Sequence, residues 1–209
     1  MTRRQATFAT VDTRDKLLRL AARAFGTQGY AATTMRTIAE QAGIEAASIY
    51  YHYASKEDLL EAVMEHGGER ILSHTREVIA ALPAGADAEQ RFRAGLLGLM
   101  TALIQYGDYT QAHGRRLAEL PDKVRERQIR RRARHQEFWH AMLEDLRADG
   151  RLRPDIDIAL SRVFILNTIT SVQSWFNPSK GTPEKVVDEL CAIFFDGVRP
   201  KTPCAPAVA

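Results

Sequence analysis

Almost every long segment of the chain repeats its apolar residues at helical spacing, and this periodicity constrains the fold more than any other feature. An α-helix has about 3.6 residues per turn, so apolar residues three or four positions apart lie on one face. Segment 87–106 is an example, with intervals of four, three and four residues between Phe92, Leu96, Leu99 and Leu103. The sequence contains no paired strand pattern and no internal repeat. It therefore predicts an all-α fold.

Glycine, proline and capping residues divide the chain into about nine predicted helices. Gly29 and Gly43 follow helical patterns at positions where a left-handed stop is typical. Ser55 and Asp58 have the spacing of a capping box at the start of a long helix. The predicted helices cover residues 12–28, 35–42, 46–53, 56–81, 87–106, a short segment within 108–120, 121–148, 156–176 and 183–197.

The composition is that of an ordinary soluble protein with a slightly basic balance. The net charge of +3 and the isoelectric point of about 9.0 permit contact with nucleic acid without requiring it. The two cysteines, Cys191 and Cys204, have no metal-ligand spacing, so we expect a reducing compartment and neither a metal nor a cofactor. No apolar signal segment follows the N-terminus, and polar residues interrupt the longest apolar stretch, 156–176. We expect a cytoplasmic protein that does not contact a membrane.

Residues 33–60 have the pattern of a helix-turn-helix, in which two short helices pack at a steep angle across a tight turn. Ala39 is small enough for close packing of the first helix, and Gly43 tolerates the positive φ that the turn requires. The residues spaced to form a shared core are Ile38, Ala42, Ile44, Ile49 and Tyr53.

Four consecutive ring residues, Tyr50 to Tyr53, favour this interpretation over an ordinary helical hairpin with an aromatic core. Consecutive helical residues turn by about 100° each, so four in a row cannot all face one core. At least two rings must project outward, where a hydroxyl or an imidazole can reach phosphate oxygens. The second helix is otherwise small or polar, and the DNA major groove, about 12 Å wide, admits such a surface.

Residues 13–60 resemble the N-terminal domain of TetR-type transcriptional repressors. The match includes Tyr53, where the family more commonly has Phe. The residues that carry the resemblance are Phe25, Gly29, Tyr30, Thr33-Thr34, Ile38-Ala39, Gly43, Ser48-Ile49-Tyr50-Tyr51-His52-Tyr53 and Lys56-Glu57-Asp58-Leu59-Leu60.

The resemblance implies roles for matching residues. Thr34 would cap the first helix of the motif and meet a phosphate, and Arg36 would read a base, since a guanidinium suits guanine O6 and N7. Lys56 would neutralise a phosphate, although a lone surface lysine is more often only solvated. The remaining DNA-facing residues are Ala46, Ala47 and Ser48 at the groove floor, and Tyr50, Tyr51 and His52 on the backbone.

The resemblance over the rest of the chain is architectural, and it implies a homodimer formed through the helices at 156–176 and 183–197. Both segments are apolar on nearly every face and must be buried on nearly every face. A two-fold dimer places two reading heads about 34 Å apart, so the operator should be a palindrome. The expected interface residues are Phe164, Trp175, Phe176, Leu190 and Phe194.

We expect four regions: a flexible arm at 1–11, the DNA-binding domain at 12–64, an effector-binding and dimerisation domain at 65–199, and a disordered tail at 200–209. A small-molecule effector pocket should lie among the helices of the third region, although each candidate taken alone is more often simply a core residue. The mixture of aromatic, Met and hydrogen-bonding side chains is typical of a ligand cavity. The candidates are Phe92, Leu96, Met100, Tyr106, Tyr109, His113, Trp139, Met142 and Thr168.

The identity of the effector stays open between two classes. A basic run from Arg115 to Arg134 is either a solvated helix face or a rim for the phosphates of an acyl-CoA. Some TetR-type repressors of lipid catabolism respond to such thioesters, and the turn at 150–157 resembles turns in that subgroup. The alternative is a multidrug-sensing repressor of an efflux gene. A helical enzyme is the rival from another class, but the six histidines form no i,i+4 pair and no catalytic motif.

Overall fold

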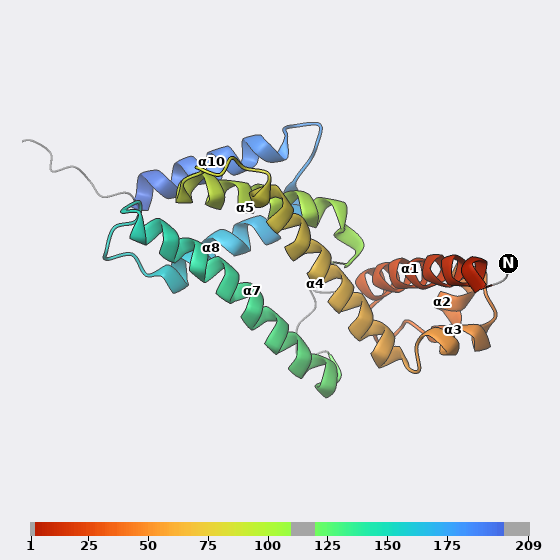
Figure 1. The fold of residues 1–209 in the computed structure, drawn as a ribbon. Helices are drawn as coiled ribbons and strands as arrows, with labels where there is room; N and C mark the ends of the chain where they lie inside the picture. Colours follow the sequence, from red (N-terminus) through yellow and green to blue (C-terminus); the bar gives the residue numbers. More distant parts are fainter. Residues whose placement is uncertain (1–2, 110–119, 199–209) are drawn as a thin grey trace, which may run out of the picture. The chain divides into compact units, whose positions relative to one another are not determined.

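The computed structural model describes residues 3–109 and 120–198, with side chains from Thr13 onward, and this part of the chain is helical without a strand (Figure 1). The predicted all-α fold is therefore confirmed. His113, Arg115, Arg116 and the predicted tail lie outside the described residues. The helices are α1 (Arg3–Thr27), α2 (Met35–Ala42), α3 (Ala46–His52), α4 (Lys56–Ala80), α5 (Ala88–Gln105), α7 (Asp122–Ala148), α8 (Ile158–Thr170), α9 (Val172–Trp175) and α10 (Pro183–Val198).

The described residues form two compact units, and each unit is built from two separate stretches of chain. The first unit comprises residues 3–71 with 105–109 and 120–133, and the second comprises 72–104 with 134–198. Helices α4 and α7 contribute residues to both units. The domain boundary expected between residues 64 and 65 does not coincide with the limits of these compact units. The assignment of DNA binding to residues 12–64 and of effector binding to residues 65–199 stays a prediction.

The core of the first unit is made by the inward faces of α1, α2, α3 and the start of α4. Leu17, Ala21 and Phe25 on α1 are buried at the predicted helical spacing. Ile38 and Ile49, from the two helices of the predicted motif, are buried with them. The rest of the predicted motif core is also enclosed: Ala39, Ala42 and Tyr53 are buried, and Ile44 packs against the cluster.

The N-terminal end differs from the prediction, because α1 begins at Arg3 instead of near Asp12. Residues 3–11 were expected to form a flexible arm, yet they continue the helix. They contain neither Gly nor Pro, and two of them are Ala, so nothing in this stretch stops a helix that starts further along the chain. The apolar pattern begins only near Leu17, and for this reason periodicity alone placed the start too late.

The predicted single helix at 156–176 is divided into α8 and α9 at Ser171. Hydroxyl groups surround the break: Thr168 donates to the carbonyl of Phe164 at 2.9 Å, and Thr170 donates to that of Leu166 at 2.7 Å. Ser171 in turn donates to the carbonyl of Thr168 at 2.9 Å. Such bonds compete with the regular helix ladder and bend it. The helical spacing of apolar residues continues across Ser171, so it could not reveal this break.

Close contact between α4 and α5 organises the second unit. A Cβ atom added to Gly98 on α5 would lie 2.8 Å from Cα of Thr75 on α4, so the two backbones approach as near as a glycine permits. Phe92 on the same helix packs against Trp139 and Phe195. Arg93 donates to Asp188 at 2.5 Å and joins α5 to α10.

We predict that Gly98→Ala lowers the free energy of unfolding by about 1–3 kcal/mol, the usual cost of overpacking a closed interior. The obstacle is the Thr75 backbone, which cannot rotate away as a side chain would. Denaturant unfolding at one fixed protein concentration measures the effect. Gly197→Ala is the matched control, because nothing lies within 4 Å of its added Cβ and it also sits in a helix. Equal stability of both variants would contradict the prediction.

Candidate nucleic-acid interface

The N-terminus of α2 is fixed by the predicted cap, Thr34. Its hydroxyl oxygen accepts from the Thr37 backbone N–H at 3.1 Å, and the Thr37 hydroxyl oxygen accepts from the Thr34 backbone N–H at 3.2 Å. The Thr37 hydroxyl donates to the carbonyl of Thr34 at 2.8 Å. Thr34 is exposed, so its own hydroxyl hydrogen can be donated to a phosphate oxygen without loss of the cap.

The turn between α2 and α3 is the one that the sequence predicted at Gly43. This residue has φ 73° and ψ 30°, the left-handed region that favours glycine. The N–H of Ile44 donates to the carbonyl of Ala39 at 3.0 Å, and that of Gly43 to Glu40 at 3.1 Å. Lys16 on α1 also donates to the carbonyl of Ala42 at 2.8 Å, a contact without any sequence signal. The carbonyls of Ala39, Glu40 and Ala42 at the end of α2 are therefore satisfied, and these bonds hold the turn into α3.

Helix α3 presents the surface that its sequence predicted. Ile49 is completely buried, whereas Tyr50 is 55% and Tyr51 84% exposed. Large apolar rings at such exposure have no role in the core of this chain, but their hydroxyl groups can reach a DNA backbone. His52 is half-buried, with its ring 5.4 Å from that of Tyr51. The residues preceding the rings are also exposed, as expected for contact with a groove floor: Ala46, Ala47 and Ser48.

Arg36 projects from α2 into solvent with 80% of its side chain exposed. Its Nε donates to Oε1 of Glu40 at 2.9 Å, one helical turn further along. An exposed pair of this kind contributes little to stability. The bond uses Nε, so the terminal nitrogens of the guanidinium can serve the two acceptors of a guanine edge.

Lys56 is held in place by Tyr30, a relation that sequence reasoning missed. The Lys56 ammonium lies 4.2 Å from the centroid of the Tyr30 ring and 3.5 Å from the carbonyl of Ala31. The Tyr30 hydroxyl donates to Oε1 of Glu57 at 2.7 Å, and this bond lowers the pKa of the Glu57 carboxyl. Tyr30 and Lys56 are both motif positions, but 26 residues separate them, so no local pattern connects them.

Tyr53, where the family more often has Phe, uses its additional hydroxyl. The ring is buried, and its oxygen accepts from Nε of Arg14 at 3.3 Å. The Arg14 guanidinium also lies 5.8 Å from the ring centroid. Burial raises the pKa of Tyr53 above its ordinary value, so the hydroxyl stays protonated at neutral pH. The substitution thus adds a link between α1 and the end of α3.

Two of the five predicted dimer residues, Phe164 and Trp175, are exposed on the single chain. Phe164 on α8 is 67% exposed, and Ile193 on α10, which was not among the predicted residues, is 72% exposed. Trp175 is also exposed, and its indole N–H donates to Ser171 at 3.0 Å. Phe176, Leu190 and Phe194 are half-buried.

The structure does not bring all predicted effector residues together. Five of them are buried in the second unit: Phe92, Leu96, Met100, Trp139 and Met142. They are densely packed, since a Cβ at Gly95 would lie 3.2 Å from Cε of Met142.

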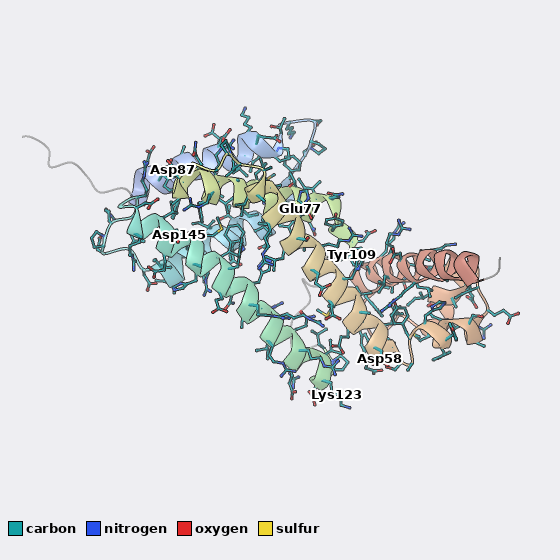
Figure 2. The ribbon with its side chains drawn as sticks, viewed as in Figure 1. Asp58, Glu77, Asp87, Tyr109, Lys123 and Asp145 are labelled. Atoms are coloured by element: carbon teal, nitrogen blue, oxygen red, sulfur yellow. The ribbon has the colours of Figure 1, made fainter. Side chains whose placement is uncertain are left out.

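Three other effector candidates are outside this buried group. Tyr106 and Tyr109 belong to the first unit, where Tyr109, labelled in Figure 2, contacts His66 with ring centroids 5.2 Å apart. Thr168 is exposed on α8. The spacing of residues in the sequence could not show which unit each candidate belongs to, because each unit is built from two separate stretches of chain.

No helix in the described part of the chain is long and apolar enough to cross a membrane. No group of three or more His, Cys, Asp or Glu side chains in the same part of the chain is placed to hold a metal ion.

Two family profiles match the chain over most of its length. Residues 17–63 match the bacterial regulatory proteins of the tetR family, and residues 85–198 match the tetracyclin repressor-like C-terminal domain. Helices α2 and α3 and the turn at Gly43 all lie within the first of these matches. The chain belongs to the TetR family of transcription regulators, as the sequence predicted.

Two of the similar proteins are KstR2 regulators from mycobacteria. The HTH-type transcriptional repressor KstR2 of Mycolicibacterium smegmatis is 31% identical over 197 residues, which cover 88% of this chain and 90% of the relative. The solved structure of the ketosteroid transcriptional regulator KstR2 of Mycobacterium tuberculosis has a TM-score of 0.75 at 26% identity, covering 90% of this chain and 95% of that one.

AibR, solved in complex with isovaleryl coenzyme A and operator DNA, has a similar fold. Its TM-score is 0.74 at 22% identity, and the match covers 88% of this chain and 98% of that one.

We predict that Tyr30→Phe reduces the free energy of unfolding by about 0.5–1 kcal/mol at pH 7, because the bond to the Glu57 carboxylate is lost. The folded-state pKa of Glu57 lies below its ordinary value, so this stabilisation is present at neutral pH and disappears as the pH falls through that pKa. Thermal unfolding at pH 7 and at pH 3 should therefore show a smaller difference from wild type at pH 3. Tyr50→Phe, which removes an exposed hydroxyl, serves as the control. A difference independent of pH would refute this assignment.

Proposed function

We propose that the protein is a repressor that binds a palindromic operator as a homodimer, acts in the cytoplasm, and releases DNA when a small-molecule effector binds. The observation that carries the proposal is the exposed surface of α3, where Tyr50 and Tyr51 directly follow the buried Ile49 and are themselves exposed. Neither ring contributes to the core of the protomer. A nucleic-acid backbone provides acceptors for them.

The surrounding groups divide into positioning contacts and base contacts. Thr34, Tyr50, Tyr51, His52 and Lys56 offer hydroxyl, imidazole and ammonium groups for phosphates, which fix the register of the protein on DNA. The base contacts are assigned to Arg36 and to the small exposed residues that begin α3: Ala46, Ala47 and Ser48.

We predict different losses for Arg36→Ala and Lys56→Ala in binding to the protein's own upstream region. Losing a bidentate base contact should weaken specific binding by about 1–3 kcal/mol, whereas losing a phosphate contact should reduce the salt slope by about one. Gel retardation across a salt series measures both quantities. Lys180→Ala removes an exposed charge from the other compact unit and should change neither. If the wild type shows no sequence-specific shift, a helical enzyme becomes the better explanation.

The homodimer is proposed from the uncovered apolar side chains of α8 and α10. Leu160, Val163 and Phe164 on α8, and Ile193 on α10, are all large and exposed in the single chain. The three on α8 are spaced at i, i+3 and i+4 and share one helix face, and an exposed apolar face is typical of a protein interface. A second copy of the chain would cover it by two-fold symmetry, and each half of a palindromic operator would then receive one α3.

We predict that Phe164→Glu weakens the dimer at least about tenfold, because a carboxylate would be buried at a contact that offers it no partner. Sedimentation velocity over a concentration series measures the association. Lys185→Glu introduces the same charge at an exposed position of α10 and should remain dimeric. Persistence of the dimer in Phe164→Glu and in Ile193→Glu would argue against this interface.

The effector is proposed to be an acyl-CoA. KstR2 relatives are repressors, and AibR carries isovaleryl coenzyme A and operator DNA on a similar fold. The basic face of α7, with exposed Lys123, Arg130 and Arg134, would attract the phosphates of such a ligand. A multidrug-sensing repressor of an efflux gene is the alternative, and it would not discriminate a CoA thioester from the free acid. To change operator occupancy from 99% to 1%, the effector must favour the released geometry by about 5.5 kcal/mol.

A further inference from the structure

The face of α7 that is directed toward α4 in the first unit changes from apolar to polar within two turns. Val124 is buried in the core cluster that includes the start of α4. Gln128 and Arg131 follow at intervals of four and three residues, so they continue the same face. Gln128 is only 2% exposed, although glutamine side chains are mostly exposed in folded proteins.

Ion pairs join this face of α7 to α4. Nη2 of Arg131 lies 3.1 Å from Oε1 of Glu65 and 3.5 Å from Oε1 of Glu61. Arg127 donates to the other oxygen of Glu61. Two guanidinium groups therefore balance two carboxylates. The pair of Arg131 with Glu61 is largely shielded from water, with 18% and 16% of the side chains exposed.

Two hydrogen-bond donors within this cluster lack an acceptor among the described residues. They are Nε2 of Gln128 and Nη1 of Arg131, and both atoms are buried. A buried donor without a partner costs about 1–3 kcal/mol, and a Met or Leu of similar volume would avoid that cost. Both unpartnered atoms are donors, so the group that would complement them is an acceptor oxygen. They lie one turn apart on one face, so a single group could receive both bonds.

We propose that Gln128 and Arg131 form a subsite for an acceptor oxygen of the effector. The inference rests on the proposed function and adds the chemistry of one ligand group. That oxygen belongs either to the acyl-pantetheine part of a CoA thioester or to its phosphates. On binding, it takes Nη1 of the Arg131 guanidinium, whose Nη2 faces Glu61 and Glu65. Because α4 begins at Lys56, directly after the DNA-binding helices, a change in the charge or position of this guanidinium acts on the segment that supports them.

The test is Gln128→Met, which removes the donor and keeps an unbranched side chain of similar size. Operator release and direct binding are measured with isovaleryl-CoA, octanoyl-CoA, coenzyme A and isovalerate. We expect wild-type stability or better without ligand, unchanged operator affinity, and about tenfold weaker binding of the thioesters. Weaker binding of coenzyme A as well assigns the oxygen to the pantetheine or the phosphates, which coenzyme A shares with both thioesters, and a loss confined to the thioesters assigns it to the acyl carbonyl.

Gln136→Met is the matched control, since it makes the same change at an exposed position of the same helix. Equal affinity of wild type and Gln128→Met for a thioester would overturn the subsite and leave a buried water as the partner of Gln128. Failure of the wild type to bind any thioester would instead overturn the proposed effector, and the subsite with it. If Gln128→Met does not fold, the Gln128 side-chain amide resonances of the wild type decide: a shift on adding thioester supports the subsite, and none contradicts it.

Discussion

The burial of Ile49 determines how this protein can meet DNA. Helix α3 has only seven residues, too few to be stable alone, so its orientation depends on packing against its neighbours. With Ile49 in the core formed by α1, α2 and the start of α4, the helical rotation of about 100° per residue places Tyr50 and Tyr51 outside. This one side chain therefore fixes the rotation of α3 about its axis. The proposed contact with DNA depends on that rotation.

The long helices α4 and α7 connect this DNA-binding head with the rest of the chain. Each contributes residues to both compact units, so neither unit is a simple segment of sequence. In the first unit, Glu61 and Glu65 on α4 pair with Arg127 and Arg131 on α7. In the second, α4 passes Gly98 of α5 at backbone contact. A repressor needs a connection that is rigid in each state yet can change between states. Largely dry ion pairs beside unpartnered donors are suited to such a change, because their energy depends strongly on what else binds there.

Local patterns predicted the motif well and the longer contacts poorly. Thr34, Gly43 and the buried spacing of Ile38, Ile49 and Tyr53 could all be identified from sequence, because caps, turns and helical faces depend on residues a few positions apart. The contact of Lys56 with Tyr30 had no such signal. The predicted start of α1 was too late, because a helical extension without an apolar face leaves no periodic signal. The break at Ser171 was missed, because bonds between side chains and the backbone do not change the apolar periodicity.

The sequence by itself determined the class of fold, the helix-turn-helix and the surface of α3, because helix formation and the facing of residues on a helix are local properties. Only the tertiary structure decided which distant groups meet. It assigned Tyr106 and Tyr109 to the first unit and the buried cluster around Trp139 to the second, and among the described residues it left Nε2 of Gln128 without an acceptor. The physical reason is that burial and pairing depend on how helices cross, and the crossing of α4 with α5 and α7 is fixed by residues far apart in the chain.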